Sequence, residues 1–194
     1  MERGKDIIII PDIHGRDFWE EATARFPEGQ FVFHGDYLDP YYIDEILNHI
    51  TSESALNNFQ EILAFAKDNP GRVTLLLGNH DMKQIGQGFM QRFAHVTQQM
   101  TIRVGGQSIV LNHNPFLAYG GAYRNVWQLF GHVHSGPLSG KGKDGDSGSR
   151  KDLPRLSMLF PRQYDVGVDN NDFRPVSFAE VKTIIQHQIN LKNE

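Results

Sequence analysis

Cysteine is absent from the 194 residues of this sequence. Disulfide bonds and thiolate metal sites are therefore excluded, so any metal ion must be held by nitrogen and oxygen ligands. Long hydrophobic runs are lacking too, because no apolar stretch approaches the roughly 18 residues of a membrane span. The N-terminal segment MERGKD has none of the apolar character of a signal peptide. We therefore expect a cytoplasmic protein that does not interact with membranes.

A strong charge of either sign is also missing. The formal net charge is −4, with 22% charged and 39% hydrophobic residues. This balance gives no general attraction to nucleic acid, and no basic stripe with interleaved aromatic residues predicts a dedicated nucleic-acid surface. At this length we expect one domain, residues 1–194, with a sizeable core, while the oligomeric state stays open.

Short β-branched or aromatic segments alternate with amphipathic segments in the first half of the chain. The pattern predicts a short helix within residues 17–26 and one or two helices within residues 43–67. Two apolar segments joined by Gly105-Gly106 predict a hairpin, and Ser177 with Glu180 predicts a capping box at the start of the last helix. This order indicates an α/β fold with two sheets and helices outside them.

Polar residues follow five of the apolar segments, at the points where strands are expected to end. The five motifs are Asp12-Ile13-His14-Gly15, Gly35-Asp36-Tyr37-Leu38-Asp39, Gly78-Asn79-His80-Asp81, Asn112-His113-Asn114-Pro115 and Gly131-His132-Val133-His134. In layered α/β folds the C-terminal ends of strands converge on one edge, where sites are built. Carboxylate, amide oxygen and imidazole groups gathered there would suit a pair of divalent metal ions.

Each motif has a purely structural explanation when it is taken alone. Asn79 or Asp81 could cap a helix, and His132 and His134 could be surface residues on one face of a strand. The stretch from residue 112 to residue 115 could be only a turn. Five such motifs in this order, each following a strand, are not expected by coincidence, so the set favours a metal site.

This series of motifs resembles the calcineurin-like metallophosphoesterases over residues 12–134. A weaker resemblance, to small bacterial members, continues in Val166-Gly167-Val168-Asp169 and in residues 173–177. The resemblance implies the metallo-dependent phosphatase fold, a four-layer α-β-β-α sandwich in which two mixed β-sheets are flanked by helices.

The resemblance also implies two sets of metal ligands that share one carboxylate. The first ion would take Asp12, His14 and His134, the second would take Asn79, His113 and His132, and Asp36 would bridge them. Among the metals that suit these ligands, Mn²⁺ is expected first, with Fe, Zn²⁺ or Ni²⁺ as alternatives. Two such ions can clamp a phosphoryl group and convert a bridging water into a hydroxide nucleophile.

His80 has a separate role in the family pattern. The histidine of this motif is not a metal ligand there, and we expect it to act as general acid or electrostatic stabiliser of the leaving oxygen. The resemblance favours Asp39 as the carboxylate that orients it. Asp81 is the second candidate, with helix capping as its alternative role. His34 matches no motif, and packing or a hydrogen bond behind the ligands is expected for it.

The substrate is left open by these motifs. Protein Ser/Thr phosphatases continue the second motif with arginine and glycine and read GNHE, whereas here Pro40 follows Asp39 and the other motif is GNHD. This departure weakens a phosphoprotein assignment, and Arg124 or Arg16 could replace the missing arginine. We expect a phosphoesterase acting on a small phosphodiester or nucleotide. A phosphomonoesterase, including a phosphoprotein phosphatase, and a non-catalytic scaffold are the alternatives.

The segment SGPLSGKGKDGDSGSR, residues 135–150, is rich in glycine, serine and charge, which predicts a mobile loop. It starts next to His134 and carries Lys141, Lys143 and Arg150. The loop could be a lid that meets an anionic substrate. It could equally be an insertion without such a role.

Overall fold

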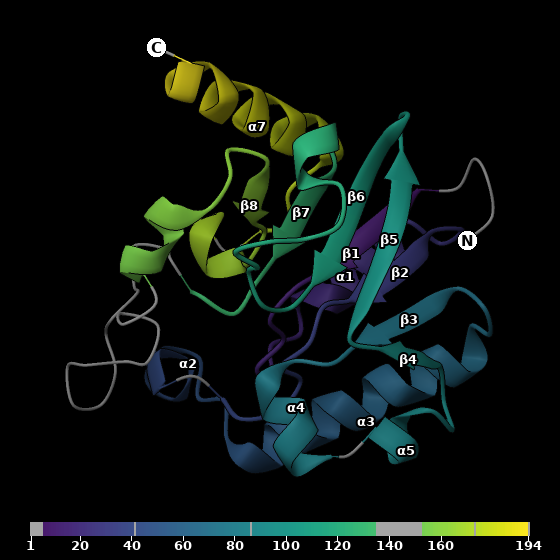
Figure 1. The fold of residues 1–194 in the computed structure, drawn as a ribbon. Helices are drawn as coiled ribbons and strands as arrows, with labels where there is room; N and C mark the ends of the chain where they lie inside the picture. The colour runs from purple at the N-terminus through teal and green to yellow at the C-terminus, as the bar shows by residue number, and fades with distance from the viewer. Residues whose placement is uncertain (1–5, 41, 86, 135–152, 173, 194) are drawn as a thin grey trace.

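The structure is a computed structural model that describes residues 6–40, 42–85, 87–134, 153–172 and 174–193. The predicted loop at residues 135–150, with Lys141, Lys143 and Arg150, lies outside the described residues. The strands form two four-stranded sheets that are flanked by helices (Figure 1). This arrangement confirms the fold class predicted from the sequence.

The first sheet follows the chain in the order β1 (Ile7–Ile10), β2 (Gln30–Phe33), β3 (Val73–Leu76) and β4 (His95–Thr97). All of its pairs are parallel, whereas the sequence predicted two mixed sheets. Parallel neighbours need a crossover connection, and helices supply the first two crossovers. These are α1 (Phe18–Arg25) from β1 to β2, and α2 (Tyr42–Leu47) with α3 (Ser52–Asp68) from β2 to β3. The crossovers bring the C-terminal ends of β1, β2 and β3 to one edge.

The second sheet has the order β5 (Gln99–Val104), β6 (Gln107–Asn112), β7 (Trp127–Phe130) and β8 (Gln163–Asp165). It is mixed, because β5 and β6 form the predicted antiparallel hairpin while β6, β7 and β8 run parallel. Gly105 and Gly106 both have positive φ angles, as the tight turn of a hairpin requires. The C-terminal ends of β6 and β7 therefore lie at the same end of this sheet.

The remaining helices are short, except the last one. They are α4 (Asn79–Gln84), α5 (Gln87–Met90), α7 (Phe178–Asn193), and the 3₁₀ helices η1 (Ala122–Arg124), η2 (Leu153–Met158) and η3 (Val168–Asn170). The predicted capping box of α7 is confirmed, because the Ser177 amide donates to Glu180 Oε2 and the Glu180 amide donates to Ser177 Oγ. No described helix is both long enough and apolar enough to span a membrane.

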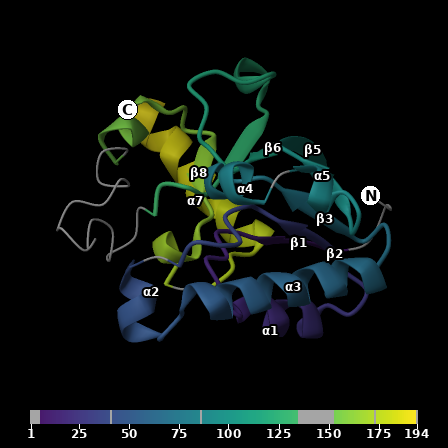
Figure 2. The same cartoon turned by 90° about the horizontal axis from the view of Figure 1, so that it is seen from below.

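Two hydrophobic cores lie on opposite faces of the first sheet. Helices α1 and α3 cover one face of this sheet (Figure 2). Phe31 and Phe33 of β2 belong to the core on that face, together with Trp19 and Ile62. Val32 points to the opposite face and belongs to the second core. This alternation follows from the two-residue period of a strand, and it explains why an uninterrupted apolar run is needed in a strand that is buried on both sides.

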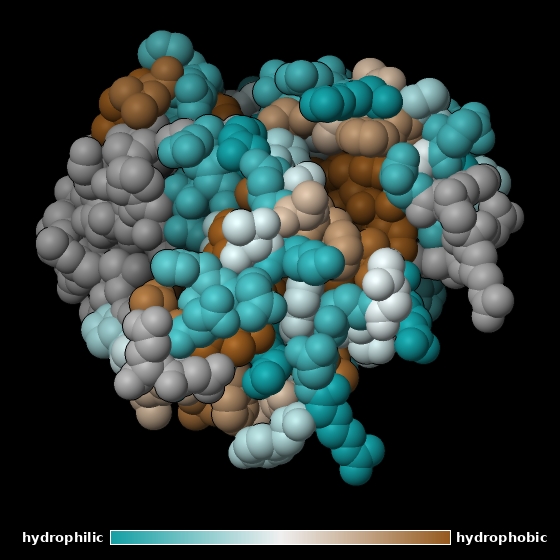
Figure 3. Space-filling view, turned by 90° about the horizontal axis from the view of Figure 1, so that it is seen from above, coloured by the Kyte–Doolittle hydropathy of each residue, from teal (hydrophilic) through white to brown (hydrophobic). Residues whose placement is uncertain are grey.

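The second core joins the two sheets and the last helix. It contains Val32 and Leu76 of the first sheet, Leu111 of the second sheet, and Val181 and Ile185 of α7. Figure 3 shows the side of the molecule at which strand β5 ends. Hydrophilic residues surround an apolar hollow on this side. The strand ends that carry the polar motifs lie at the other end of the second sheet, because β6 and β7 run opposite to β5.

Candidate active site

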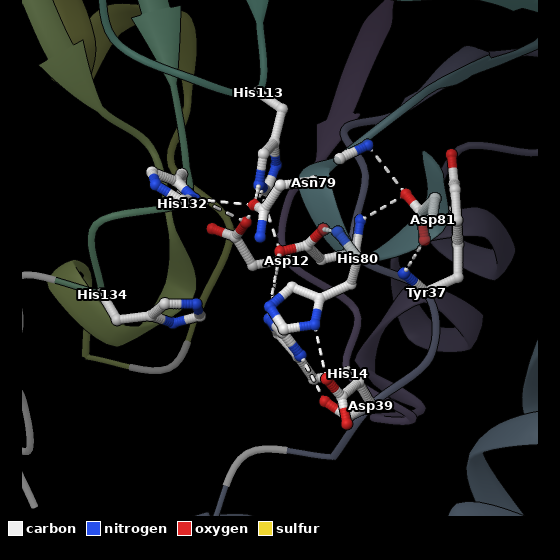
Figure 4. A network of polar contacts seen from close by, with 12 residues as sticks. Asp12, His14, Tyr37, Asp39, Asn79, His80, Asp81, His113, His132 and His134 are labelled. Carbon is white, nitrogen blue, oxygen red and sulfur yellow. Dashed lines mark hydrogen bonds and ion pairs between the residues drawn. The ribbon is translucent and has the colours of Figure 1, made fainter. Parts of the chain in front are cut away.

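The polar motifs converge at the C-terminal ends of the strands from both sheets (Figure 4). Asp12 and His14 follow β1, Asp36 follows β2, and Asn79 and His80 begin α4 after β3. His113 follows β6, and His132 and His134 follow β7. Residues that are more than 100 positions apart therefore contact one another, as in the hydrogen bond from the His132 amide to Asp12 Oδ1.

The first cluster of potential metal ligands consists of Asp12, His14 and His134, whose ligand atoms lie within 4.8 Å of one another. All three side chains are buried. Asp12 Oδ2 is fully buried and has no hydrogen-bond partner. A buried carboxylate oxygen without a partner is costly, and a cation at this position would remove that cost. The residues present therefore fit a divalent metal ion.

The second cluster is organised around the amide of Asn79. Asn79 Oδ1 lies 3.0 Å from His113 Nε2 and 2.8 Å from His132 Nδ1. Asp36, His113 and His132 also have ligand atoms within 4.8 Å of one another. These atoms form a second set of nitrogen and oxygen donors that could hold a divalent ion.

Asp36 lies between the two clusters. Its Oδ2 atom is 3.1 Å from His113 Nε2 in the second cluster and 3.8 Å from His14 Nε2 in the first. The other oxygen, Oδ1, accepts a hydrogen bond from the His80 amide at 3.0 Å. One carboxylate can therefore reach both ligand sets, which is the geometry that a bridging ligand requires.

Several site residues have left-handed backbone conformations. Nine non-glycine residues among those described have positive φ, and six of them are site residues, namely Asp12, His14, Asp36, Asp39, His132 and His134. Aspartate and histidine adopt this region more readily than most residues, yet each instance is strained by roughly 1–3 kcal/mol. The surrounding fold holds these residues in conformations that the local chain would not prefer.

Two glycines of the motifs are required by close contacts with the carboxylates. A Cβ atom on Gly78 would lie 2.0 Å from Asp36 Oδ1, and one on Gly131 would lie 2.4 Å from Asp12 Oδ2. Both distances are far below van der Waals contact. The glycines therefore let the backbone pass directly beside the two ligand carboxylates.

Three ligand imidazoles are held by hydrogen bonds at Nδ1. His14 Nδ1 lies 2.8 Å from the Asp39 carbonyl oxygen, and His113 Nδ1 lies 3.0 Å from the His34 carbonyl oxygen. His134 Nδ1 lies 2.7 Å from Asp169 Oδ2. A bond of this kind fixes the Nδ1–H tautomer and leaves the Nε2 lone pair for a metal. The rings are thus oriented before any ion binds.

His80 contacts Asp39, the carboxylate that the resemblance favoured as its partner. His80 Nδ1 lies 2.5 Å from Asp39 Oδ2, while Nε2 faces the clusters at 4.0 Å from Asp36 Oδ2. The His80 side chain is 37% exposed, whereas the ligands His14 and His113 are almost completely buried. His80 therefore lies at the open side of the clusters, where an incoming molecule can reach it.

Asp81 caps helix α4, which was the alternative role considered for it from the sequence. Its carboxylate accepts hydrogen bonds from the backbone amides of Asp36, Tyr37 and Gly78, at 2.7–2.9 Å. Burial, together with the charge of Asp36, raises the pKa of Asp81 to about 6. Asp81 thus caps α4 and at the same time anchors the backbone of Asp36, and it does not contact His80 through these bonds.

The electrostatics of the metal-free clusters are those of a site that attracts cations. Burial by itself would raise the pKa of Asp36, but the hydrogen bond and charge of His113 hold it well below its usual range. Burial would lower the pKa of His113, yet the hydrogen bond to Asp36 and the charges of Asp36 and Asp12 raise it to about 9. Without a metal, a proton on His113 balances the buried carboxylates, and a divalent ion would take its place.

His34 contributes to the site through its backbone. Its ring is fully buried, neither ring nitrogen has a hydrogen-bond partner, and burial lowers its pKa to about 3. The ring is therefore neutral and packs 6.5 Å from the His113 ring, centroid to centroid. The expected support of the ligands comes instead from the His34 carbonyl oxygen, which accepts from His113 Nδ1.

The two arginines proposed as phosphate-binding groups do not have that role in the structure. Arg16 is buried, and its guanidinium donates to the carboxylates of Asp44 and Asp169. Arg124 lies in η1, which precedes β7, whereas His132 follows the other end of this strand. A four-residue strand spans roughly 13 Å, so Arg124 is remote from the clusters. Both suggestions were wrong. The ion pairs of Arg16 and the position of Arg124 before β7 depend on the tertiary structure, and the sequence around each arginine does not reveal them.

Asp169 was not predicted as a site residue from the sequence, although it contacts His134 of the first cluster. Asp169 lies in η3, and Arg16 holds it from the turn after β1. The only available signal was the weak resemblance around Val166-Gly167-Val168-Asp169. Asp169 contacts His134 and Arg16, which lie 35 and 153 positions away in the sequence. Contacts over such separations leave no local pattern in the sequence.

The structure brings the five motifs together at the C-terminal ends of the strands, with His80 and Asp39 paired beside two clusters of potential metal ligands. This is the kind of arrangement that the resemblance to the calcineurin-like metallophosphoesterases implied.

Comparison with curated proteins finds a partial match to a phosphatase. The catalytic subunit of serine/threonine-protein phosphatase 6 from Drosophila melanogaster is 30% identical over 83 residues, which cover 41% of this chain and 24% of the phosphatase. The chain thus matches about a quarter of the length of that curated relative. No protein-family model matches the sequence.

Three solved structures overlap with the chain. A protein of unknown function from Aquifex aeolicus has a TM-score of 0.47 at 18% identity, covering 92% of this chain and 98% of its own. The Escherichia coli phosphoesterase YfcE has a TM-score of 0.43 at 16% identity, covering 66% and 69%. The Pseudomonas putida nuclease MPE has a TM-score of 0.41 at 18% identity, covering 66% and 60%. At TM-scores below 0.5 these overlaps carry no weight for substrate or metal.

Proposed function

We propose that this protein is a dinuclear metal-dependent phosphoesterase that hydrolyses a small phosphodiester or a nucleotide. The observation that carries the proposal is the position of Asp36, whose Oδ2 atom lies 3.1 Å from His113 and 3.8 Å from His14, one imidazole from each ligand cluster. A carboxylate in this position can hold two ions at once. A structural single-metal site would have no use for the second cluster.

The proposed ligand sets are those of the sequence analysis. Asp12, His14 and His134 hold one ion, Asn79, His113 and His132 hold the other, and Asp36 bridges them. Mn²⁺ is the proposed metal, because carboxylate, amide and imidazole ligands without thiolate suit it. When bound, the ions would neutralise the phosphoryl oxygens and lower the pKa of a bridging water, so that hydroxide is present near neutral pH.

His80 is the proposed general acid. Asp39 accepts the hydrogen at Nδ1, which leaves Nε2 directed at the clusters and able to carry the transferable proton. As the phosphorus–oxygen bond breaks, His80 would donate this proton from Nε2 to the departing oxygen. The Asp39 carboxylate would stabilise the imidazolium before the transfer and hold the ring in place throughout.

Charge favours a diester over a monoester. Both terminal nitrogens of Arg16 already bond to carboxylates, so this arginine does not grip a phosphate. A phosphodiester carries one negative charge, whereas a monoester carries close to two near neutral pH. A site without an available arginine in its first motif is therefore better suited to the monoanionic substrate.

A phosphomonoesterase, including a phosphoprotein phosphatase, is the second candidate. The match to a phosphatase catalytic subunit over 83 residues favours it. A non-catalytic metal-binding scaffold is the third reading, and the presence of every expected ligand together with His80 argues against it.

Hydrolysis assays across metals test the proposal. Protein stripped with a chelator should be inactive on an aryl phosphodiester and should regain activity with Mn²⁺, or with Fe, Zn²⁺ or Ni²⁺. The diester should be cleaved faster than the matching aryl phosphate monoester, and a nucleotide panel should then define the substrate. His113→Ala should abolish the metal-dependent activity, while His187→Ala, an exposed histidine of α7, serves as the matched control. Full activity in metal-free protein would contradict the proposal.

A further inference from the structure

A buried chain of charged groups lies behind the first ligand cluster. Arg16 donates from Nε and Nη2 to Asp44 at 3.0 and 2.7 Å. It also donates from Nη1 and Nη2 to Asp169 at 3.2 and 3.0 Å. All three residues are at least 90% buried, so these pairs are shielded from water and from salt. Bidentate bonds on both sides fix the position of Asp169 within the fold.

Asp169 in turn supports the ligand His134. Its Oδ2 atom lies 2.7 Å from His134 Nδ1. Its other contacts are with the Arg16 guanidinium, which donates to both of its oxygens. Asp169 can therefore accept the Nδ1 hydrogen of His134, which leaves Nε2 as the nitrogen available to a metal.

The backing of His134 differs in chemistry from that of two other ligand histidines. His14 and His113 are backed by neutral backbone carbonyl oxygens, whereas His134 is backed by an ionised carboxylate. A carboxylate behind an imidazole raises the basicity of the ring and strengthens its bond to a metal. The carboxylate behind His134 thus gives the first cluster a more basic imidazole than the backbone carbonyl behind His113 gives the second.

The charges of the chain add to this effect. Two carboxylates, Asp44 and Asp169, face one guanidinium, so the group keeps a net charge of −1 beside the first cluster. The first cluster also contains its own carboxylate, Asp12. The second cluster has the neutral amide of Asn79 in the corresponding place.

We infer that Asp169, held in place by Arg16 and Asp44, is a positioning residue that makes the Asp12–His14–His134 cluster the tighter of two metal positions. The inference rests on the proposed function only in needing two bound ions, and it does not depend on the substrate. Arg16 acts on the first cluster only through Asp169, and its contribution is to hold the Asp169 carboxylate in place.

The test is a calorimetric titration of metal-free protein with Mn²⁺. Wild type should bind two ions in a tighter and a weaker class. Asp169→Asn keeps the size of the side chain and removes its charge, and it should weaken the tighter class by about 10–100-fold, the usual effect of losing such a partner, and leave the weaker class unchanged. Asp44→Asn should weaken the tighter class less, because it acts only through Arg16. Glu180→Gln, the same kind of change on the surface of α7, is the control and should change neither class.

A second measurement needs no variant. In wild type carrying one equivalent of diamagnetic Zn²⁺, nitrogen-15 NMR of the rings should show His134 bound through Nε2 with a proton on Nδ1, and His132 unbound. His132 bound first, or His134 bound through Nδ1, would overturn the inference even if Asp169→Asn does not fold.

The two proposals fail in different ways. Wild type that binds no divalent metal contradicts the proposed function and with it the inference. Wild type that binds two ions, with Asp169→Asn weakening both classes equally or neither, contradicts the inference alone.

Discussion

The two ligand clusters differ in how the protein holds them. The first contains the carboxylate Asp12, and a buried ionic chain supports its histidine His134. The second contains the amide Asn79, and a backbone carbonyl supports its histidine His113. The second cluster is also more exposed to solvent than the first, because His132 is only partly buried. The first cluster is therefore rich in charge, while the second depends on Asp36 for its negative charge.

This difference teaches that two clusters with similar candidate ligands need not be equivalent. Both draw on nitrogen and oxygen ligands at strand ends, yet the groups behind those ligands set their affinity. In the proposed dinuclear site, Asp36 would supply a second carboxylate to the first position and the sole carboxylate to the second. Changes at Asp36, at His80 and at residues remote from both clusters should therefore have effects of very different size.

The largest effect is expected for Asp36→Asn. The second position loses its sole carboxylate and should become empty, and the first should bind its ion at least about 100-fold more weakly, since a direct ligand matters more than the outer partners that contribute 10–100-fold. Activity should disappear. Metal analysis after dialysis measures the loss, and two tightly held ions in the variant would show that Asp36 is not the bridge.

His80→Ala should separate catalysis from metal binding. His80 lies at the open side of the clusters and bonds to Asp39, so its loss should leave both ions in place. The value of kcat should fall by ~10²–10⁴, as is typical when a general acid is removed. Activity assays combined with metal analysis of the same sample measure both quantities.

The leaving group provides the control for His80→Ala. A nucleoside alkoxide needs a proton as its bond breaks, whereas a nitrophenolate is stable as an anion, so the nucleoside ester should suffer far more. An equal loss on both esters, with the metals retained, would remove the general-acid role. Recovery of activity with excess metal would instead make His80 a ligand.

Asp39→Asn should give a smaller effect of the same kind. The Asp39 side chain is 49% exposed, so its interaction with His80 is partly screened, and we expect a loss of about tenfold in kcat on the nucleoside ester. Metal content should not change, because His14 bonds to the backbone oxygen of Asp39, which the substitution keeps. A loss of one ion in this variant would mean that the side chain also positions His14.

The smallest effect is expected far from both clusters, at the capping box of α7. The hydrogen bond from the Ser177 amide, together with Arg174, lowers the pKa of Glu180 from 4.5 to about 2. A depressed pKa stabilises the fold above pH 4.5, and this contribution is lost as the pH falls towards 2. Glu180→Gln should lower the Tm at pH 7 by no more than about 2 °C.

The acid range provides the control for Glu180→Gln. The difference in Tm between the variant and wild type should shrink as the pH falls from 4.5 towards 2, because Glu180 takes up its proton over this range, and thermal unfolding followed by circular dichroism measures it. A difference that persists unchanged at pH 2 would show that the capping bond does not depend on the charge. Metal content should be the same in both proteins at pH 7.

Most elements of the fold followed from local patterns. The helix predicted within residues 17–26 is α1, the region 43–67 forms α2 and α3, and the turn at Gly105-Gly106 closes the β5–β6 hairpin. These features depend on neighbours within a few positions, which is the range over which periodicity, capping and turn propensity act. Strand direction in the first sheet was less accessible, because pairing joins residues that are distant in the chain.

The sequence by itself determined which groups are available for chemistry. The sequence has no cysteine and carries aspartate, asparagine and histidine at five strand ends, so the types of candidate ligand and their order along the chain could be read directly. Only the tertiary structure decided how each group is used. It buried Arg16 between two carboxylates, placed Asp169 behind His134, and held Asp36 between the two clusters in a left-handed conformation. The physical reason is that ion pairs and imidazole hydrogen bonds act over a few ångströms of space, and segments up to 153 residues apart come that close only once both sheets have formed.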